Sequence, residues 1–247
     1  MSRKILSLTI SLLLHLLAGC SHTKNLIEKD LTANEMYQRG NDLFKKKEYK
    51  KAADQFEMIF FQYPGKEITI KAELMQIYAL YLAGDYDSAI DISEVFIKLH
   101  PRHKDVIYAY YMKALSYYAQ ISSVKLDQSK TRYAKENFEQ LIARFPGTKY
   151  ATDSSLKLDL INDHLAGKEV NVGTYYLVKK NPIAALKRFQ IVINKYQQTS
   201  HIKEALYRMV EANKMLGLDD EAKKYAAVLG YNFQSSKWYK RAHALLN

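Results

Sequence analysis

Apolar residues recur three and four positions apart along most of the chain, which is the spacing of an amphipathic helix. Runs that alternate apolar and polar residues, the pattern of a half-buried strand, are almost absent. Short turn segments, such as the one around Gly84 and the one around Pro101, interrupt the helical pattern. We therefore predict an all-α protein of about ten or eleven helices.

The helical pattern repeats along the chain. In the clearest copy, Gly40 and Ala52 let two antiparallel helices approach, Phe56 fills the space between them, and Pro64 ends the second helix. These positions match the consensus of the tetratricopeptide repeat (TPR), which is about 34 residues long. The alanine of the second helix recurs in every copy, at Ala52, Ala89, Ala134, Ala185 and Ala222.

The predicted fold is therefore an α-solenoid of about five TPR helix pairs over residues 32–247. The third repeat carries an insertion near residues 121–130, and an extra helical stretch at 150–165 precedes the rest of the fourth. Stacked repeats curve and offer a concave groove to partners. The repeats are expected near 33–66, 70–103, 107–148, 150–199 and 200–234, followed by a capping helix within 235–247.

The N-terminus has the features of a bacterial export signal. A positive start precedes an apolar run at residues 5–17, which is shorter than the roughly 20 residues that a membrane-spanning helix needs. Residues 17–20, LAGC, resemble a lipobox, and Cys20 is the single cysteine of the chain. We predict a signal peptide at 1–19 that is removed, a lipid on Cys20, and a tether at 20–31. The alternative is an incidental cysteine behind an ordinary signal peptide.

The composition and motifs of the chain narrow the classes of partner and of function that it can have. A net charge of +11 suits anionic partners, but an export signal argues against nucleic acid and leaves weak attraction to anionic lipid as an alternative. No catalytic motif is recognisable, and with Cys20 acylated no thiol nucleophile remains. We interpret His100 and His103 as solvated turn residues and Glu169 as part of a solvated face. The sequence thus predicts a non-enzymatic protein without metal or cofactor.

The chain contains 20 tyrosines, many of them clustered near residues 78–86 and 108–118. At helical spacing some must lie in the core, and others are expected to line the groove, where rigid amphipathic rings suit peptide contacts. Tyr37 stands where TPR domains that clamp a carboxylate carry a lysine, although Asn41 matches such a site. A chaperone-tail clamp is therefore not supported.

Several segments resemble the BamD (ComL-type) family, lipoproteins of the outer-membrane β-barrel assembly (BAM) machinery. The most specific lies within 145–176, and the sequence departs from the family at Leu126, Lys157 and Gln197. The segments that carry the resemblance are 17–20, 34–64, 108–118, 126–158, 169–196 and 231–246.

The resemblance implies a lipid-anchored protein on the periplasmic face of the cell outer membrane. It implies binding to the POTRA region of a BamA-like barrel protein, to unfolded outer-membrane β-barrel proteins and to other BAM lipoproteins. Arg188 falls at the family's repeat-four arginine and, with Tyr176, is the implied partner contact, facing an acidic POTRA residue. The alternative is an ordinary solvated arginine.

The family's N-terminal repeats hold the pocket for substrate signals, for which Tyr37, Asn41, Tyr78 and Tyr81 are the candidates. Barrel substrates end in extended segments with an aromatic terminus, and an aromatic, positively charged groove suits a C-terminal carboxylate. Two other functions stay open. A different periplasmic TPR adaptor, such as a secretin pilotin, should lack the extra helical stretch, and an envelope enzyme would need an appended domain.

Overall fold

A computed structural model describes residues 31–247 of the chain. The predicted signal peptide at 1–19 and the lipidation site Cys20 lie outside the described residues. Residues 33–247 form one compact unit, to which the description below applies.

The described part of the chain is helical throughout, with eleven helices and no strand. The prediction of an all-α TPR solenoid is confirmed. The helices are α2 (Ala33–Lys45), α3 (Tyr49–Gln62), α4 (Glu67–Leu82), α5 (Tyr86–Leu99), α6 (Val106–Ala119), α7 (Ser129–Arg144), α8 (Lys149–Val178), α9 (Pro182–Lys195), α10 (Ile202–Met215), α11 (Asp219–Phe233) and α12 (Lys237–Leu246).

Several helices begin at a side chain that accepts a hydrogen bond from the first turn. Asp85 accepts from the Ser88 amide at 3.4 Å, and Thr148 accepts from the Ala151 amide at 3.2 Å. Asn181 does the same for α9, whose first residue is Pro182, a position where the missing amide hydrogen costs nothing. These residues set where the helices start.

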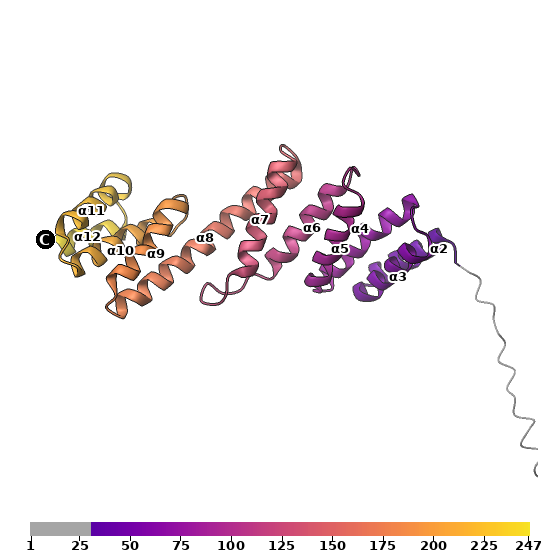
Figure 1. Cartoon of the computed structure of the whole chain (residues 1–247), viewed down its shortest axis with the longest axis horizontal. Helices are drawn as coiled ribbons and strands as arrows, with labels where there is room; N and C mark the ends of the chain where they lie inside the picture. The colour runs from indigo at the N-terminus through magenta and orange to yellow at the C-terminus, as the bar shows by residue number, and fades with distance from the viewer. Residues whose placement is uncertain (1–30) are drawn as a thin grey trace, which may run out of the picture. The chain divides into compact units, whose positions relative to one another are not determined.

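The helices pack as successive antiparallel pairs, from α2 with α3 to α10 with α11 (Figure 1). The first helices of neighbouring pairs contact one another: α2 touches α4, α4 touches α6, α6 touches α8 and α8 touches α10. The second helices α3, α5, α7, α9 and α11 make no such contact with one another. The first helices therefore form the inner layer of the curve, and the second helices splay apart on its outer side.

The core repeats with the sequence. Phe56, Phe96, Phe138 and Phe189 occupy equivalent places on the second helices of the first four pairs, and each is fully buried. The recurring alanines are also fully buried. The ring of Phe56 lies directly against the backbone of Gly40, where a Cβ would meet its Cε1 atom at 2.6 Å. Only a glycine permits that approach.

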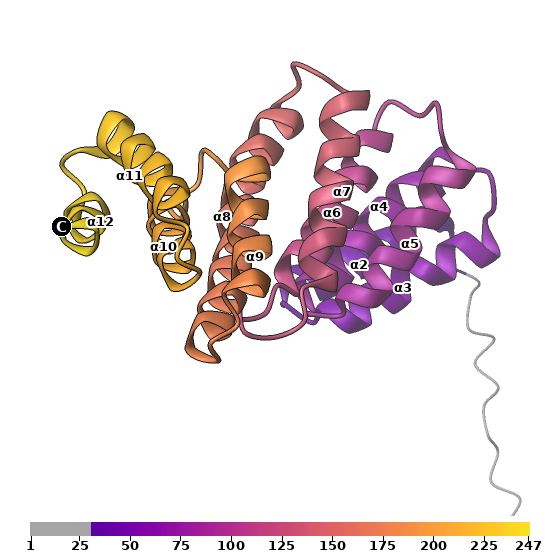
Figure 2. The same ribbon diagram turned by 60° about the vertical axis from the view of Figure 1, so that its left-hand side comes forward.

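Helix α8 differs from the sequence interpretation. The stretch 150–165, expected as an extra helical segment before the fourth repeat, joins the following helix without a break to give one helix of 30 residues. Figure 2 shows α9 running alongside the later part of this helix. Because α8 is about twice as long as its neighbours, it takes part in two separate cores.

Helix α12 closes the C-terminal end of the array by packing on α10 and α11. Its Ala242 is fully buried, and Trp238, Tyr239 and Leu246 cover a cluster that includes Val210 and Leu229. The predicted capping segment therefore forms a helix that shields the last apolar face.

Candidate partner-binding site

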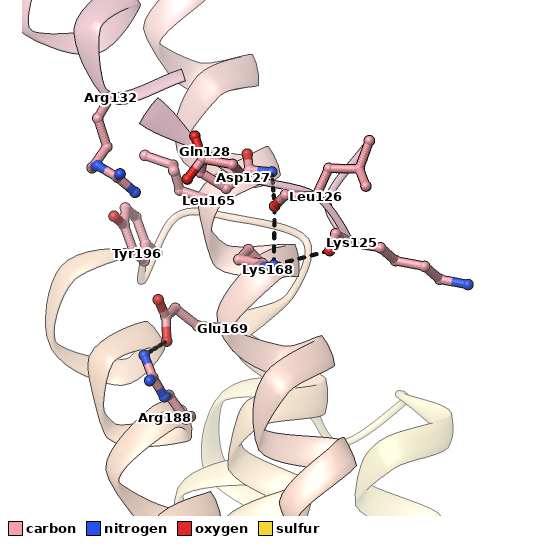
Figure 3. Close-up of a pocket in the computed structure, with 10 residues that line it drawn as sticks. All are labelled: Lys125, Leu126, Asp127, Gln128, Arg132, Leu165, Lys168, Glu169, Arg188 and Tyr196. Atoms are coloured by element: carbon pink, nitrogen blue, oxygen red, sulfur yellow. Dashed lines mark hydrogen bonds and ion pairs between the residues drawn. The ribbon is translucent and has the colours of Figure 1, made fainter. Parts of the chain in front are cut away.

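The length of α8 leaves a gap between α7 and α9. Helix α7 packs on the first half of α8, where Phe138 joins Ile161 and Leu165. Helix α9 packs on the second half, where Phe189 joins Val170 and Leu177. Helices α7 and α9 do not contact each other. The gap holds a pocket of about 430 Å³, with the middle of α8 as its floor (Figure 3).

The pocket is lined by charged side chains from three helices and from the loop that joins α6 to α7. It contains more basic than acidic groups, and Leu165 and Tyr196 provide its apolar surface. The lining residues are Lys125, Leu126, Asp127, Gln128, Arg132, Leu165, Lys168, Glu169, Arg188 and Tyr196.

Arg188, the predicted partner contact, lies at this pocket. Its Nη1 atom is 3.2 Å from Oε2 of Glu169, so the two side chains form an ion pair between α9 and α8. The side chain of Arg188 is 41% exposed and that of Glu169 is 20% exposed. The interpretation of Glu169 as part of a solvated face was wrong, because its side chain is mostly buried and pairs with an arginine 19 positions away on another helix.

Tyr196 connects the two sides of the pocket. Its ring packs against the core clusters on both sides, and Nζ of Lys135 lies 5.3 Å from the ring centroid. Burial raises the pKa of Tyr196, the carboxylates of Glu169 and Glu139 raise it further, and Arg132 opposes them. The hydroxyl therefore lies in the field of both Arg132 and Glu169, and Figure 3 shows its side chain between theirs.

The insertion loop is tied to α8 by Lys168. Its Nζ donates hydrogen bonds to the backbone carbonyls of Lys125 and Leu126, at 3.2 and 3.0 Å. The buried Gln128 braces the loop from inside by donating to the carbonyls of Ser123 and Leu126. These bonds fix the rim of the pocket next to α8.

Tyr176, the second predicted partner contact, does not line this pocket. It packs against the core of α8, α9 and α10, while its neighbour Tyr175 is 57% exposed. The structure therefore brings Arg188 to the pocket and leaves Tyr176 in a packing position.

The inner face of the N-terminal repeats carries a row of tyrosines from α4, α6 and α8. Tyr108 and Tyr111 each contact the ring of Tyr150, with centroids 6.3 and 5.0 Å apart. Tyr78 and Tyr81, both predicted substrate contacts, join the row. Burial raises the pKa values of Tyr108 and Tyr111, and neighbouring groups raise them further. Tyr78 is one of these neighbours for Tyr108, and Tyr81 is one for Tyr111. At neutral pH the hydroxyls of Tyr108 and Tyr111 stay protonated, and that of Tyr111 donates to Oδ2 of Asp153 at 2.6 Å.

The other two predicted substrate contacts lie on α2. Tyr37 packs on Phe56 with ring centroids 5.5 Å apart, and both Tyr37 and Asn41 are half-buried. The contact between α2 and the row runs through Phe44, whose ring lies 5.4 Å from that of Tyr78. Sequence reasoning missed Phe44 and Tyr150, which carry only the signal of an aromatic at helical spacing.

A further correction concerns His100, predicted as a solvated turn residue. Its Nε2 atom lies 3.1 Å from Oε2 of Glu73, and its ring packs on Phe96. Glu73 is only 5% exposed, and burial raises its pKa, while His100 and then His103 act in the opposite direction. The pair links α4 to the end of α5.

Among residues 31–247, no group of three or more His, Cys, Asp or Glu side chains is placed to hold a metal ion. Within the same part of the chain, none of the helices is long and apolar enough to cross a membrane.

Stacked helix pairs with an accessible charged pocket and an aromatic inner face define the class: a TPR-type binding scaffold. The chain belongs to the YfiO family of outer membrane lipoproteins, whose model matches residues 29–229. The resemblance predicted from the sequence is confirmed.

Three relatives support this assignment, and each is described as outer membrane protein assembly factor BamD. The protein from Rickettsia prowazekii is 56% identical over 93% of this chain and 92% of its own length. The protein from Caulobacter vibrioides is 40% identical over 93% of this chain and 75% of its own. The protein from Neisseria meningitidis serogroup A is 31% identical over 97% of this chain and 95% of its own.

Proposed function

We propose that this protein is a non-enzymatic subunit of an outer-membrane β-barrel assembly complex. The observation that carries the proposal is the 56% identity to an outer membrane protein assembly factor along 93% of the chain. In this role the protein binds other proteins, works with further lipoproteins of the complex, and uses neither a cofactor nor nucleic acid.

The C-terminal half is proposed to bind the POTRA region of a BamA-like barrel protein. The pocket between α7 and α9 supports this, because Arg188 is accessible there and basic groups outnumber acidic ones around it. An acidic residue of the partner is the complementary group. Tyr176, half-buried on the core of α8, α9 and α10, is proposed as the second partner contact.

The N-terminal half is proposed to recognise unfolded barrel substrates. Tyr78 and Tyr81, within the inner row, offer flat apolar faces and hydroxyl groups to an extended segment with an aromatic end. Tyr37 and Asn41 on α2 extend this surface towards the N-terminus.

A lipid on Cys20 is proposed to hold the protein on the periplasmic face of the outer membrane. Stable anchoring needs more than one acyl chain, since a single chain gives only marginal, reversible binding. Replacing Cys20 with Ala should move the protein from the membrane fraction to the soluble fraction. Continued sedimentation of Cys20→Ala with the outer membrane would show that lipid is not its main anchor.

The experiment that tests the proposal is affinity capture of the tagged mature protein from gently solubilised envelopes, followed by mass spectrometry. We expect a POTRA-containing barrel protein in near-equal amount. Recovery of a secretin or a pilus channel without any POTRA protein would refute the proposal and leave a lipid-anchored repeat adaptor.

A further inference from the structure

We infer that the pocket between α7 and α9 is a carboxylate-binding site in which Glu169 holds the place of an acidic side chain from the partner. The inference rests on the proposed function of Arg188 and deepens it in two ways. It names a second arginine of the site, Arg132, and it identifies an internal competitor that weakens binding.

The first step is the charge balance. Among the lining residues, Lys168 is engaged with the backbone carbonyls of the insertion loop. Asp127 is engaged as well, since its Oδ1 atom accepts from the Ser129 amide at 2.8 Å. Asp127 also lies in the field of Arg132 and Glu169 pairs with Arg188, so basic side chains still outnumber acidic ones around the two arginines.

The second step is the geometry of that carboxylate. Glu169 accepts a single hydrogen bond from Arg188, from Nη1 to Oε2 at 3.2 Å, whereas a guanidinium can bind a carboxylate through two parallel bonds. Arg188 thus keeps donors that a second carboxylate can use. Arg132 lies on the opposite side of Tyr196 and forms no ion pair within residues 31–247.

The third step is access. The pocket has room for an acidic side chain, and Arg188 is 41% exposed at its edge. An incoming Asp or Glu can therefore reach Arg188 from solvent, and Arg132 provides a second positive charge that attracts it. The incoming carboxylate then shares the guanidinium with Glu169, which competes with it for the same positive charge.

The strength of ion pairs predicts the direction and the size of the change in affinity when the Glu169 carboxylate is removed. Exposed ion pairs contribute up to about 1 kcal/mol, and 1.4 kcal/mol corresponds to a tenfold change in affinity. Removing the competitor while keeping its shape, with Glu169→Gln, should therefore lower the Kd for the partner by roughly two- to fivefold.

The test measures the Kd between the full mature chain and the purified POTRA region of the BamA-like protein from the same organism. We expect tighter binding for Glu169→Gln, weaker binding for Arg132→Gln, and at least tenfold weaker binding for Arg188→Ala. The double variant Glu169→Gln/Arg188→Ala should bind no better than Arg188→Ala, because Glu169 acts as a competitor only through Arg188.

Glu94→Gln is the matched control. Glu94 forms an inter-helix pair with Lys113 at 2.8 Å in the N-terminal half, so its change alters net charge by the same amount and removes the same kind of contact. A thermal unfolding curve for each variant verifies that it folds. If Glu94→Gln tightens binding as much as Glu169→Gln does, net charge explains the effect and the inference fails.

The remaining outcomes separate the inference from the proposed function. If the wild type binds, Arg188→Ala weakens binding, and Glu169→Gln leaves it unchanged or weaker, the proposed function stands and the inference is wrong. If the wild type does not bind the POTRA region at all, the proposed function of this site is wrong, and the inference falls with it.

Discussion

At Gly40 the space for one methyl group determines how closely two helices can approach. The fully buried ring of Phe56 occupies the place of a side chain at that position, and an added Cβ would lie 2.6 Å from it. Such a distance forces the ring or the helix to move. The contact therefore sets the spacing of α2 and α3.

We expect Gly40→Ala to destabilise the protein by about 1–2 kcal/mol. Overpacking a core costs about 1–3 kcal/mol, and the gain in helix propensity returns at most about 1 kcal/mol. Urea unfolding measures the change. Adding Phe56→Leu should recover part of the loss by making room, whereas strictly additive losses in the double variant would contradict this account.

A second residue-scale prediction concerns the buried Glu73. Because burial raises its pKa in the folded state, the folded protein holds a proton that the unfolded chain has released once the pH exceeds about 4.5. The free energy of unfolding of the wild type therefore falls as the pH rises from about 4.5 towards the raised pKa of Glu73 in the folded protein. Glu73→Gln, which cannot ionise, should gain stability relative to wild type from pH 4.5 upwards.

Denaturant unfolding of both proteins across this pH range checks the prediction. Glu57→Gln is the control for the loss of one acid at this place, since the exposed Glu57 lies with Glu73 at a small cavity lined by α3, α4 and α5. A constant difference between Glu73→Gln and wild type at every pH would contradict it.

Residue-scale predictability depends on whether a contact lies within a repeat. Gly40, Ala52 and Phe56 were identified from their spacing, because the consensus encodes how one helix pair packs. The partners of Arg188 and His100 were not, since Glu169 and Glu73 lie 19 and 27 positions away on other helices. No local pattern records which helix faces meet at such distances.

At the element scale, α8 separates this chain from a regular repeat array. The sequence interpretation found helical periodicity on both sides of residue 165 but treated 150–165 as an extra helical stretch, separate from the rest of the fourth repeat. Continuity across that point comes from packing, because Leu165 belongs to one core cluster and Ala166 to the next. A sequence pattern predicts each helix face, but not that both faces belong to one uninterrupted helix.

We expect Asn171→Pro to uncouple the two cores. Asn171 is exposed, so the change removes little packing, but an interior proline costs a helix about 3 kcal/mol. Unfolding by urea should broaden or split into two steps, with new protease cleavage near residue 171. Asn171→Ala is the control and should stay within about 0.5 kcal/mol of wild type. A single unshifted transition in the proline variant would refute the prediction.

At the scale of the whole molecule, the solenoid depends on its cap. Each pair is stabilised mainly by its neighbours, and within residues 31–247 the last pair has only α12 on its outer side. Ending the chain after Gln234 removes Trp238, Tyr239 and the buried Ala242 from the last cluster. Faster amide hydrogen exchange should follow in α10 and α11, with α2 to α5 unchanged.

The control for that truncation is Leu245→Ala, which alters a partly exposed side chain of α12 and should leave exchange in α10 and α11 near the wild-type rate. Equal acceleration along the entire solenoid after truncation would show that stability is shared globally instead of between neighbours.

Because α8 is uninterrupted, its length also sets the angle between the parts of the protein that precede and follow it. Each residue of an α-helix adds about 1.5 Å of rise and about 100° of rotation. One residue added at the middle of α8 would therefore turn everything from α9 to α12 by roughly a quarter of a circle relative to the tyrosine row. Seven added residues, close to two full turns, would nearly restore the original direction at a greater separation. The number of residues in this one helix thus fixes the azimuth at which the two ends of the protein present their surfaces.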